Sequence, residues 1–540
     1  MICVRAMRRA LGTHGDHDRL GRRAVQGTRD RSQRQVHRSR QRACGAVLGA
    51  HELRVMTPLL LITALVAALA DTGGCRPVSG LDAHALLVRA ATATGLDTAR
   101  RTVLEVHGYD VVQHAYESDR TYPPFLAEVQ SLDEWFDPAS GVQRTTSHST
   151  IAGYEYGLTT IGDERASYLV RDTALVPNPA LHGALYQTRP LDVWAVLTDW
   201  LEATDVRVAE RCTYRDYPRI VLSRRGVRGP ERLYLDPKSG YPEKLDREEP
   251  HYLWGQVHVE FVWSTWERVQ DAHLPGAAFR MEDGETQIAR TFGVRRLAPR
   301  DSAPSLAVPA HETAMTPAIA AFLAPNRPDT TRVSDNVFVL RNAGYGEVVA
   351  LDRDTVYVFD ATQGEERVRQ DSTWISTLFP GRHPIVVVVT DLAWPHVAGV
   401  RAWVARGATI VSHRASRAFL ERVVNRRWTL APDALERHRS RAVFRFRAVS
   451  DSMSLAGGDI DVFPIDGAAS EVALAAFIRP ARFLWASDYI QDLRAPTQYV
   501  DDIVAAVRRT GVAPSRVAAE HAPLSDWARV SALAAPVSSP

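Results

Sequence analysis

The chain has 540 residues, a formal net charge of +2 and 45% hydrophobic residues. This length is too great for one core, so at least two domains are expected. The near balance of charge argues against nucleic acid as the main partner, and the composition is that of an ordinary globular protein.

Residues 1–55 differ from the rest, because they contain thirteen Arg and no Lys and show no helical or strand periodicity. A disordered basic arm is one interpretation. The favoured one is a mis-assigned start, with translation beginning at Met56. The apolar run Leu59–Ala70 is too short to span a bilayer and predicts a signal peptide over 56–75. We therefore expect an exported protein, periplasmic or extracellular, with no transmembrane span.

Two of the four cysteines, Cys3 and Cys44, lie in this leader. Cys75 follows Thr72-Gly-Gly, an incomplete lipoprotein box, so a lipid anchor at Cys75 is one alternative. An exported chain with so few cysteines has no disulfide framework, and the one pair open to it is Cys75 with Cys212.

An antiparallel sheet domain with one or two helices is predicted over 81–300. Helical spacing marks 84–94 and 191–201. The segment 236–240, Asp-Pro-Lys-Ser-Gly, has Pro and Gly where a hairpin loop favours them. Alternating apolar residues predict strands at 102–107, 166–170, 219–223, 232–236, 243–246 and 257–263.

The order of these elements, with Leu235-Asp-Pro and Trp266-Glu-Arg-Val-Gln-Asp-Ala-His-Leu-Pro275, resembles the half-barrel of periplasmic lipoprotein carriers. That resemblance implies a concave face that holds acyl chains, and hence a lipid-like ligand. The alternative is that the concave face packs on its own helices or on the second domain.

A proline-rich linker is predicted over 301–332, followed by a second domain over 333–535. The second domain opens with short strands at 336–342, 348–351 and 355–361. A valine-rich strand, Ile385–Val389, comes next. Val397, Val400, Val404 and Gly407 then have the spacing of a helix with a glycine stop, and 408–412 predicts another strand.

The strand Ile385–Val389 runs into Thr390-Asp-Leu-Ala-Trp-Pro-His396-Val-Ala-Gly399. This segment resembles the Thr-His-x-His-x-Asp-His-x-x-Gly turn of the metallo-β-lactamase superfamily, which opens a dinuclear metal site. The Thr, the last His and the Gly are retained. The other three ligand positions are Asp391, Ala393 and Pro395.

Two later segments extend the resemblance over about two hundred residues. The first runs from Gly467-Ala-Ala-Ser-Glu471 to Phe483-Leu-Trp-Ala-Ser-Asp488 and keeps the family's Asp, whereas its His is Ala469. The second, Val517-Ala-Ala-Glu-His521, resembles the last ligand loop. The resemblance implies an α+β chain whose C-terminal part is an αββα metallo-β-lactamase sandwich.

Three of the seven family ligand positions survive, and the resemblance assigns them to one metal ion: His396, Asp488 and His521. Two histidines and a carboxylate are a known donor set for zinc and for non-haem iron. Asp391 is the candidate catalytic residue, either as the base or as the group that orients a water molecule. One Zn or Fe ion is therefore the expected cofactor, and the alternative is that no metal is bound.

Two functions follow. One is an exported hydrolase of this superfamily with a reduced, at most mononuclear, metal site. The other is a non-catalytic relative, a pseudoenzyme, that binds an apolar or lipid-like ligand. A stoichiometric metal assay separates them. The expected partner is a small molecule or a lipid-like ligand, and the sequence does not identify the substrate, because specificity in such folds lies in loops around the site.

Overall fold

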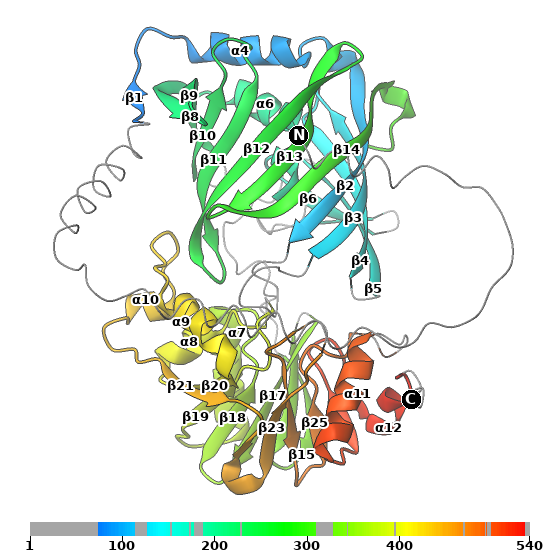
Figure 1. Ribbon diagram of the computed structural model, residues 1–540, viewed down its shortest axis with the longest axis vertical. Helices are drawn as coiled ribbons and strands as arrows, with labels where there is room; N and C mark the ends of the chain where they lie inside the picture. Colours follow the sequence, from blue (N-terminus) through cyan, green and yellow to red (C-terminus); the bar gives the residue numbers. More distant parts are fainter. Residues whose placement is uncertain are drawn as a thin grey trace, which may run out of the picture. The chain divides into compact units, whose positions relative to one another are not determined.

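A computed structural model describes the chain between residues 74 and 534, with gaps (Figure 1). The expected leader, most of the expected signal peptide, Cys3 and Cys44 lie outside the described residues. Within these residues, no helix is long and apolar enough to cross a membrane. The structure mixes helix and sheet, as the α+β class predicts. The described residues are 74–113, 127–151, 154–171, 174–177, 187–226, 229–308, 328–342, 344–393, 396–467, 470–491, 493 and 498–534.

The first half of the described chain forms one 14-stranded antiparallel sheet with the order β1-β8-β9-β10-β11-β12-β13-β14-β2-β3-β4-β5-β6-β7. Helices α4 (Ala83–Thr94) and α6 (Val193–Glu202) accompany it. Its strands are β1 (Arg76–Pro77), β2 (Thr102–Gln113), β3 (Ala127–Asp137), β4 (Val142–Ile151), β5 (Tyr154–Gly162), β6 (Ser167–Arg171), β7 (Ala174–Pro177), β8 (Arg207–Tyr214), β9 (Tyr217–Gly226), β10 (Gly229–Leu235), β11 (Pro242–His251), β12 (Gly255–Val269), β13 (Ala272–Glu282) and β14 (Glu285–Pro299).

Every strand predicted in this half has a counterpart in the sheet, and both predicted helices are present. The predicted loop 236–240 joins β10 to β11, which pair antiparallel. Helix α4 begins where Asp82 accepts hydrogen bonds from the backbone N–H groups of the first turn. It ends at Gly95, whose φ of +81° is left-handed and whose position lies against the backbone of β13.

Other strands, among them β3, β4, β13 and β14, were not predicted. Their inward positions hold charged side chains, such as Glu134, Arg280 and Arg290, which are buried. Because a strand is recognised by alternating apolar residues, a strand with a charged buried face carries no such signal.

The second half forms a 7-stranded sheet and a 6-stranded sheet. The 7-stranded sheet contains β15 (Asp329–Ser334), β16 (Val337–Asn342), β17 (Tyr345–Asp352), β18 (Thr355–Phe359), β19 (Ile385–Val388), β20 (Thr409–His413) and β21 (Arg445–Val449). The 6-stranded sheet contains β22 (Met453–Leu455), β23 (Ile460–Pro464), β24 (Leu474–Ile478), β25 (Phe483–Trp485), β26 (Arg516–Ala518) and β27 (Ser525–Asp526).

Six helices accompany these two sheets in the described ranges (Figure 1). The helix predicted from the valine spacing is present as α8. Helix α7 was not predicted, because buried Arg367 and Asp371 interrupt its apolar face and pair with each other at 2.9 Å. The helices are α7 (Glu365–Leu378), α8 (Val400–Ala405), α9 (Arg417–Asn425), α10 (Ala434–Arg437), α11 (Gln498–Thr510) and α12 (Trp527–Ser531).

Three hydrophobic clusters define the layers of this half. One lies between the two sheets and includes Val388, Val411, Ala476 and Trp485. A second lies between the 6-stranded sheet and α11, with Ile503 as an example. The helices α8 and α9 contribute to a third cluster, which also receives residues from the 7-stranded sheet. The order of layers is therefore helix, sheet, sheet, helix.

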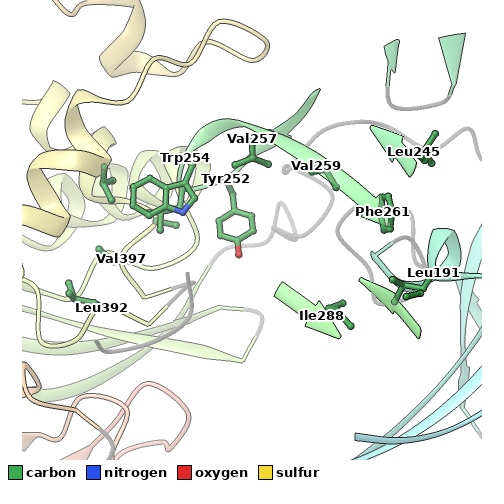
Figure 2. Close-up of a cluster of buried hydrophobic side chains, with 14 of the residues drawn as sticks. Leu191, Leu245, Tyr252, Trp254, Val257, Val259, Phe261, Ile288, Leu392 and Val397 are labelled. Atoms are coloured by element: carbon green, nitrogen blue, oxygen red, sulfur yellow. The ribbon is translucent and has the colours of Figure 1, made fainter. Parts of the chain in front are cut away.

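The third cluster also includes residues of the 14-stranded sheet, and Figure 2 shows part of it, with Trp254, Leu392 and Val397 among the labelled side chains. The indole of Trp254 lies edge-on to Phe419, with the ring centroids 5.4 Å apart. Residues from both halves of the described chain thus share one apolar core.

The predicted linker 301–332 is structured at both ends. Leu306 and Val308 pack against a small cluster formed by residues of the 14-stranded sheet, including Ile161 and Tyr168. At the other end, β15 already begins at Asp329. Residues 309–327 lie outside the described residues.

Candidate metal centre

The candidate site is formed by four segments, each of which directly follows a strand. Asp360 follows β18, Thr390 and Asp391 follow β19, and Ser487 follows β25. The loop 519–521 follows β26. Since β18 and β19 are parallel, as are β25 and β26, these segments gather where the carboxyl ends of the strands lie.

Direct hydrogen bonds next to the site join the 7-stranded sheet to the 6-stranded sheet. The hydroxyl of Thr390 contacts that of Ser487 at 2.8 Å, and the backbone N–H of Leu474 donates to the carbonyl of Thr390 at 2.7 Å. Asp360 accepts from the backbone and hydroxyl of Thr390 and from the indole of Trp485, each at 2.6 Å. This network fixes the turn that carries Asp391.

His396 lies buried between two carboxylates. Its Nδ1 lies 3.1 Å from Oδ1 of Asp391, and its Nε2 contacts the carboxylate of Glu520. Asp391 is itself buried and accepts further hydrogen bonds, from the backbone N–H of Ala393 at 2.8 Å and from the hydroxyl of Ser487 at 2.9 Å. Both oxygens of Asp391 are therefore engaged, which holds the imidazole ring in one orientation.

Glu520 is fully buried, with 0% of its surface exposed. Among the described residues its ion-pair partner is His396, whose Nε2 contacts Oε2, and its Oε1 accepts no hydrogen bond from a described residue. A buried carboxylate oxygen without a hydrogen bond is costly unless a cation balances it. Glu520 was not among the residues expected from the sequence, because the family pattern marks only the histidine that follows it.

His521 and Asp488 complete the group. Nε2 of His521 lies 3.3 Å from Oδ1 of Asp488, and both side chains are partly exposed. The ring of Tyr345, at the start of β17, lies 5.1 Å from that of His521 and 5.9 Å from that of His396. Tyr345, Asp488 and His521 are partly exposed, whereas Glu520 and Asp391 are buried.

The backbone of the last loop is held from the neighbouring hairpin. Arg341 donates to the carbonyls of Glu520 and His521 at 3.2 and 3.3 Å, and the N–H of Gly346 donates to the carbonyl of Glu520 at 2.8 Å. A side chain at position 346 would approach the carbonyl of Ala519 to 3.1 Å. This close approach of the two backbones favours a residue without a side chain at position 346.

Electrostatics at the site reflect an excess of carboxylates. Burial raises the pKa of Asp488 to about 7 and that of Glu520 well above its ordinary value. Burial lowers the pKa of His521 to about 3, so this imidazole is neutral and keeps a lone pair for a ligand. Burial opposes a charge on His396, but Glu520 and Asp391 raise its pKa well above the ordinary value.

The structure brings together the three residues that the sequence assigned to a metal. His396, Asp488 and His521, with Glu520 as a fourth member, each offer one donor atom, and these atoms all lie within 4.8 Å of one another. Ala393 lies in the same turn and offers no donor. Pro395 and Ala469, the other expected neighbours of the pocket, lie outside the described residues.

These four donors fit a single divalent transition-metal ion. Two imidazoles with two carboxylates suit zinc, iron and manganese. The carboxylate of Glu520, whose Oε1 has no hydrogen bond from a described residue, supplies negative charge that the cation would balance. A second ion about 3.5–4 Å away would need further donors, and the described residues offer no second group of this kind next to the first.

Two other groups of potential ligands are explained without a metal. Cys75 and Cys212, near Glu210, form a disulfide. In the group that contains Asp246 and Glu260, the ammonium group of Lys244 lies 3.0 and 2.6 Å from the two carboxylates and already supplies the cation.

Comparisons with known proteins give structural neighbours only. No protein-family model matches the chain, and no curated protein matches it either. Among solved structures, the DIM-1 metallo-β-lactamase is 13% identical, with a TM-score of 0.30 over 38% of this chain and 95% of that one. A metallo-β-lactamase from Pontibacter korlensis is 16% identical, with a TM-score of 0.30 over 38% and 98%. The FIM-1 metallo-β-lactamase from Pseudomonas aeruginosa, in its mono-zinc form, is 12% identical, with a TM-score of 0.30 over 39% and 97%.

Proposed function

We propose that the protein is a hydrolase that holds one divalent transition-metal ion through His396, Asp488, Glu520 and His521. The observation that carries the proposal is the convergence of these four donors, one of which is the buried carboxylate of Glu520, whose Oε1 has no hydrogen bond from the described residues. Zinc or iron is the proposed metal, since the donor set suits both.

In this proposal each residue has a distinct part. Nε2 of His396, a neutral His521 and the carboxylates of Glu520 and Asp488 are the ligands. A divalent ion held this way supplies hydroxide near neutral pH, because it lowers the pKa of water to about 7. Asp488 and His521, the partly exposed ligands, lie on the side from which a substrate enters.

Asp391 is proposed as a positioning residue. The sequence made it the candidate base, but its oxygens are buried and taken by His396, Ser487 and the backbone of residue 393. A carboxylate that accepts from Nδ1 of a histidine leaves Nε2 free to bind a metal and fixes the ring. This geometry supports orientation of a ligand rather than proton transfer to a substrate.

Metal content tests the proposal. The full chain, purified without chelator and loaded with Zn²⁺, is expected to retain close to one equivalent after buffer exchange, measured by plasma mass spectrometry. Glu520→Gln is expected to weaken Zn²⁺ binding by more than about a hundredfold, because loss of a ligand exceeds the 10–100-fold cost of losing an outer partner.

A matched pair of histidine variants provides the control. His521→Ala is expected to lose the ion, whereas His383→Ala removes a half-buried histidine that bonds backbone carbonyls and is expected to keep it. Hydrolysis of chromogenic ester, β-lactam and phosphodiester substrates should follow the metal content. Two tightly bound ions would contradict the donor count. No ion, with His521→Ala as stable as the parent, would favour the non-catalytic alternative.

We also propose that the protein is exported. The disulfide between Cys75 and Cys212 supports this, because disulfides persist in oxidising compartments. A sulfur in a disulfide cannot carry a thioether-linked lipid, so the same bond favours a pairing role for Cys75 over a lipid anchor. Mass spectrometry of the secreted or periplasmic fraction tests this proposal. Peptides from residues 21–42 in that fraction would contradict removal of the leader.

A further inference from the structure

The positive charge of the second half is concentrated in one segment. Residues 401–447 contain twelve arginines and three acidic residues, which gives a net charge of +9. The rest of the sequence after residue 55 contains 40 basic and 56 acidic residues, which gives a net charge of −16. A basic segment in an otherwise acidic chain indicates a surface that attracts anionic groups.

Acidic side chains neutralise only part of this segment. Arg401 is buried and lies 2.7 Å from the carboxylate of Asp433. The carboxylate of Glu436 lies 2.6 Å from Arg427 and 2.7 Å from Arg439. Residues 440–450, in contrast, contain three arginines and no acidic residue. None of these three arginines has an ion-pair partner within the described ranges.

The three unpaired arginines lie on and just before β21. This strand is the last of the 7-stranded sheet, and β20 is its one neighbour among the described strands. Phe444 and Phe446 are half-buried and pack against the apolar core on one face. The alternate residues are exposed, namely Arg441, Val443, Arg445 and Arg447. The edge therefore presents free backbone groups beside a row of arginines.

The spacing of this row matches an extended chain. Alternate side chains of a strand lie on one face, about 6.6 Å apart. Arg445 and Arg447 follow this repeat, and Val443, which is 53% exposed, continues it. A peptide with an acidic residue at every second position has the same repeat when it is extended. Such a peptide places carboxylates opposite the arginines while its backbone pairs with the edge.

The charge of the edge also selects the partner. Pairing of β21 with β21 of a second copy puts arginine opposite arginine, which is unfavourable. The phosphates of a membrane or a nucleic acid match the arginines but leave the backbone groups of the edge unpaired. The other edge strand of this sheet, β15, carries both signs, because Arg332 pairs with Asp335. An acidic extended segment is the partner that fits β21.

We infer that the free edge of β21 binds an extended acidic segment of another protein and adds it to the 7-stranded sheet as a further strand. Arg441, Arg445 and Arg447 bind the carboxylates of that segment, and the backbone of β21 supplies the hydrogen bonds. The inference uses no residue of the metal centre and does not depend on the proposed hydrolase function.

Fluorescence anisotropy with the full chain tests the inference. The probe is a labelled peptide of about six residues, a usual strand length, in which glutamate alternates with threonine. Binding is expected, and it should weaken as the salt concentration rises. The same peptide with glutamine in place of glutamate is expected to bind at least about tenfold more weakly, because it lacks the charges.

Two N-methylated peptides separate strand addition from simple attraction of charge. An added strand directs the N–H groups of every second residue to its neighbour, and the others point away. Methylation of one alternate set of N–H groups is expected to weaken binding at least about tenfold, because several hydrogen bonds are lost. Methylation of the other set should leave binding nearly unchanged, although both peptides keep every charge.

Variants locate the surface. Arg445→Glu is expected to weaken binding of the glutamate peptide at least about fivefold, because attraction becomes repulsion. Arg447→Glu should act in the same direction, whereas Arg445→Lys keeps the charge and should bind nearly as well as the parent. Arg508→Glu, exposed on α11, is the matched control with the same change in net charge, and it should leave binding nearly unchanged.

Several results would overturn the inference, provided that circular dichroism shows folded variants. These are no binding of the glutamate peptide, equal binding of the two N-methylated peptides, or equal binding by Arg445→Glu and Arg508→Glu. Phosphatidylglycerol vesicles or single-stranded DNA that bind as tightly as the peptide, and lose affinity in Arg445→Glu, would instead identify a general anion-binding surface.

Discussion

At the scale of single residues, Asp391 shows how a buried carboxylate can fix the orientation of a histidine. Oδ1 of Asp391 lies 3.1 Å from Nδ1 of His396. The interaction needs a rigid support, and Ser487 supplies it from the other sheet. In the proposed metal centre, Asp391 would therefore orient a ligand rather than be one.

We predict that Asp391→Asn lowers Zn²⁺ affinity by about 10–100-fold without abolishing binding, because all four donors remain but His396 loses its charged partner. Competition with a fluorescent zinc chelator measures the change. Ser487→Ala removes one of several bonds to Asp391 and should have a smaller effect in the same direction. An affinity unchanged in Asp391→Asn would contradict the positioning role.

Arg290 is the clearest buried charge of the 14-stranded sheet, because its side chain is 0% exposed and contacts both Asp110 and Glu134. We predict that Arg290→Met destabilises the fold by about 3–5 kcal/mol, since two buried carboxylates lose their partner. Urea unfolding measures the change. Arg268→Met, on β12 of the same sheet, removes an arginine that is exposed together with its partner Asp271; it is the control and should leave the midpoint nearly unchanged.

At the scale of elements, a disulfide holds the short strand β1 in the sheet. This strand has only two residues, Arg76 and Pro77, which pair with Arg211 and Glu210 of β8. A two-residue edge strand has too few hydrogen bonds to be stable alone. The disulfide between Cys75 and Cys212 joins it to β8 across a sequence separation of 137 residues.

We therefore predict that Cys212→Ser lowers the free energy of unfolding by about 2–5 kcal/mol, as loss of a native disulfide that closes a long loop does. Hydrogen exchange should show that β1 loses protection first, whereas α6 stays protected. The parent protein treated with reductant should behave like the variant. Equal stability of the reduced and oxidised parent would contradict a structural role for this bond.

At the scale of the whole molecule, buried acids make stability depend on pH. Burial raises the pKa of Asp192 and of Glu164 to about 7, whereas in the unfolded chain such groups ionise near pH 4. The folded protein therefore holds protons that the unfolded chain has released. This contribution is full below about pH 4 and is lost as the pH rises through about 7.

We predict that the thermal unfolding midpoint falls between pH 5 and pH 8, and that Asp192→Asn reduces this slope. The opposite trend holds in acid, because a hydrogen bond from His258 lowers the pKa of Glu260 to about 2, and that contribution is lost as the pH falls below about 4. Calorimetry in buffers of equal ionisation enthalpy measures the unfolding midpoint both in the acid range and between pH 5 and pH 8. A midpoint that rises steadily from pH 5 to pH 8 would contradict the prediction.

The sequence by itself determined the elements whose buried faces are apolar. Helices α4 and α6, strands β9 to β12 and the strand that leads into Thr390 were all predicted, because apolar periodicity and turn residues are local signals. The same holds for His396, Asp488 and His521 as neighbours in space, since each follows a strand in an order that resembles a known family.

The tertiary structure alone decided the elements and residues whose role depends on a distant partner. Strand β14 buries the charge of Arg290, which is tolerable only because Asp110 and Glu134, far away in the sequence, neutralise it. The buried carboxylates of Glu520, Glu134 and Asp192 belong to the same class. A carboxylate has no periodic signature, so its burial and its missing hydrogen bond become visible only once the chain is folded.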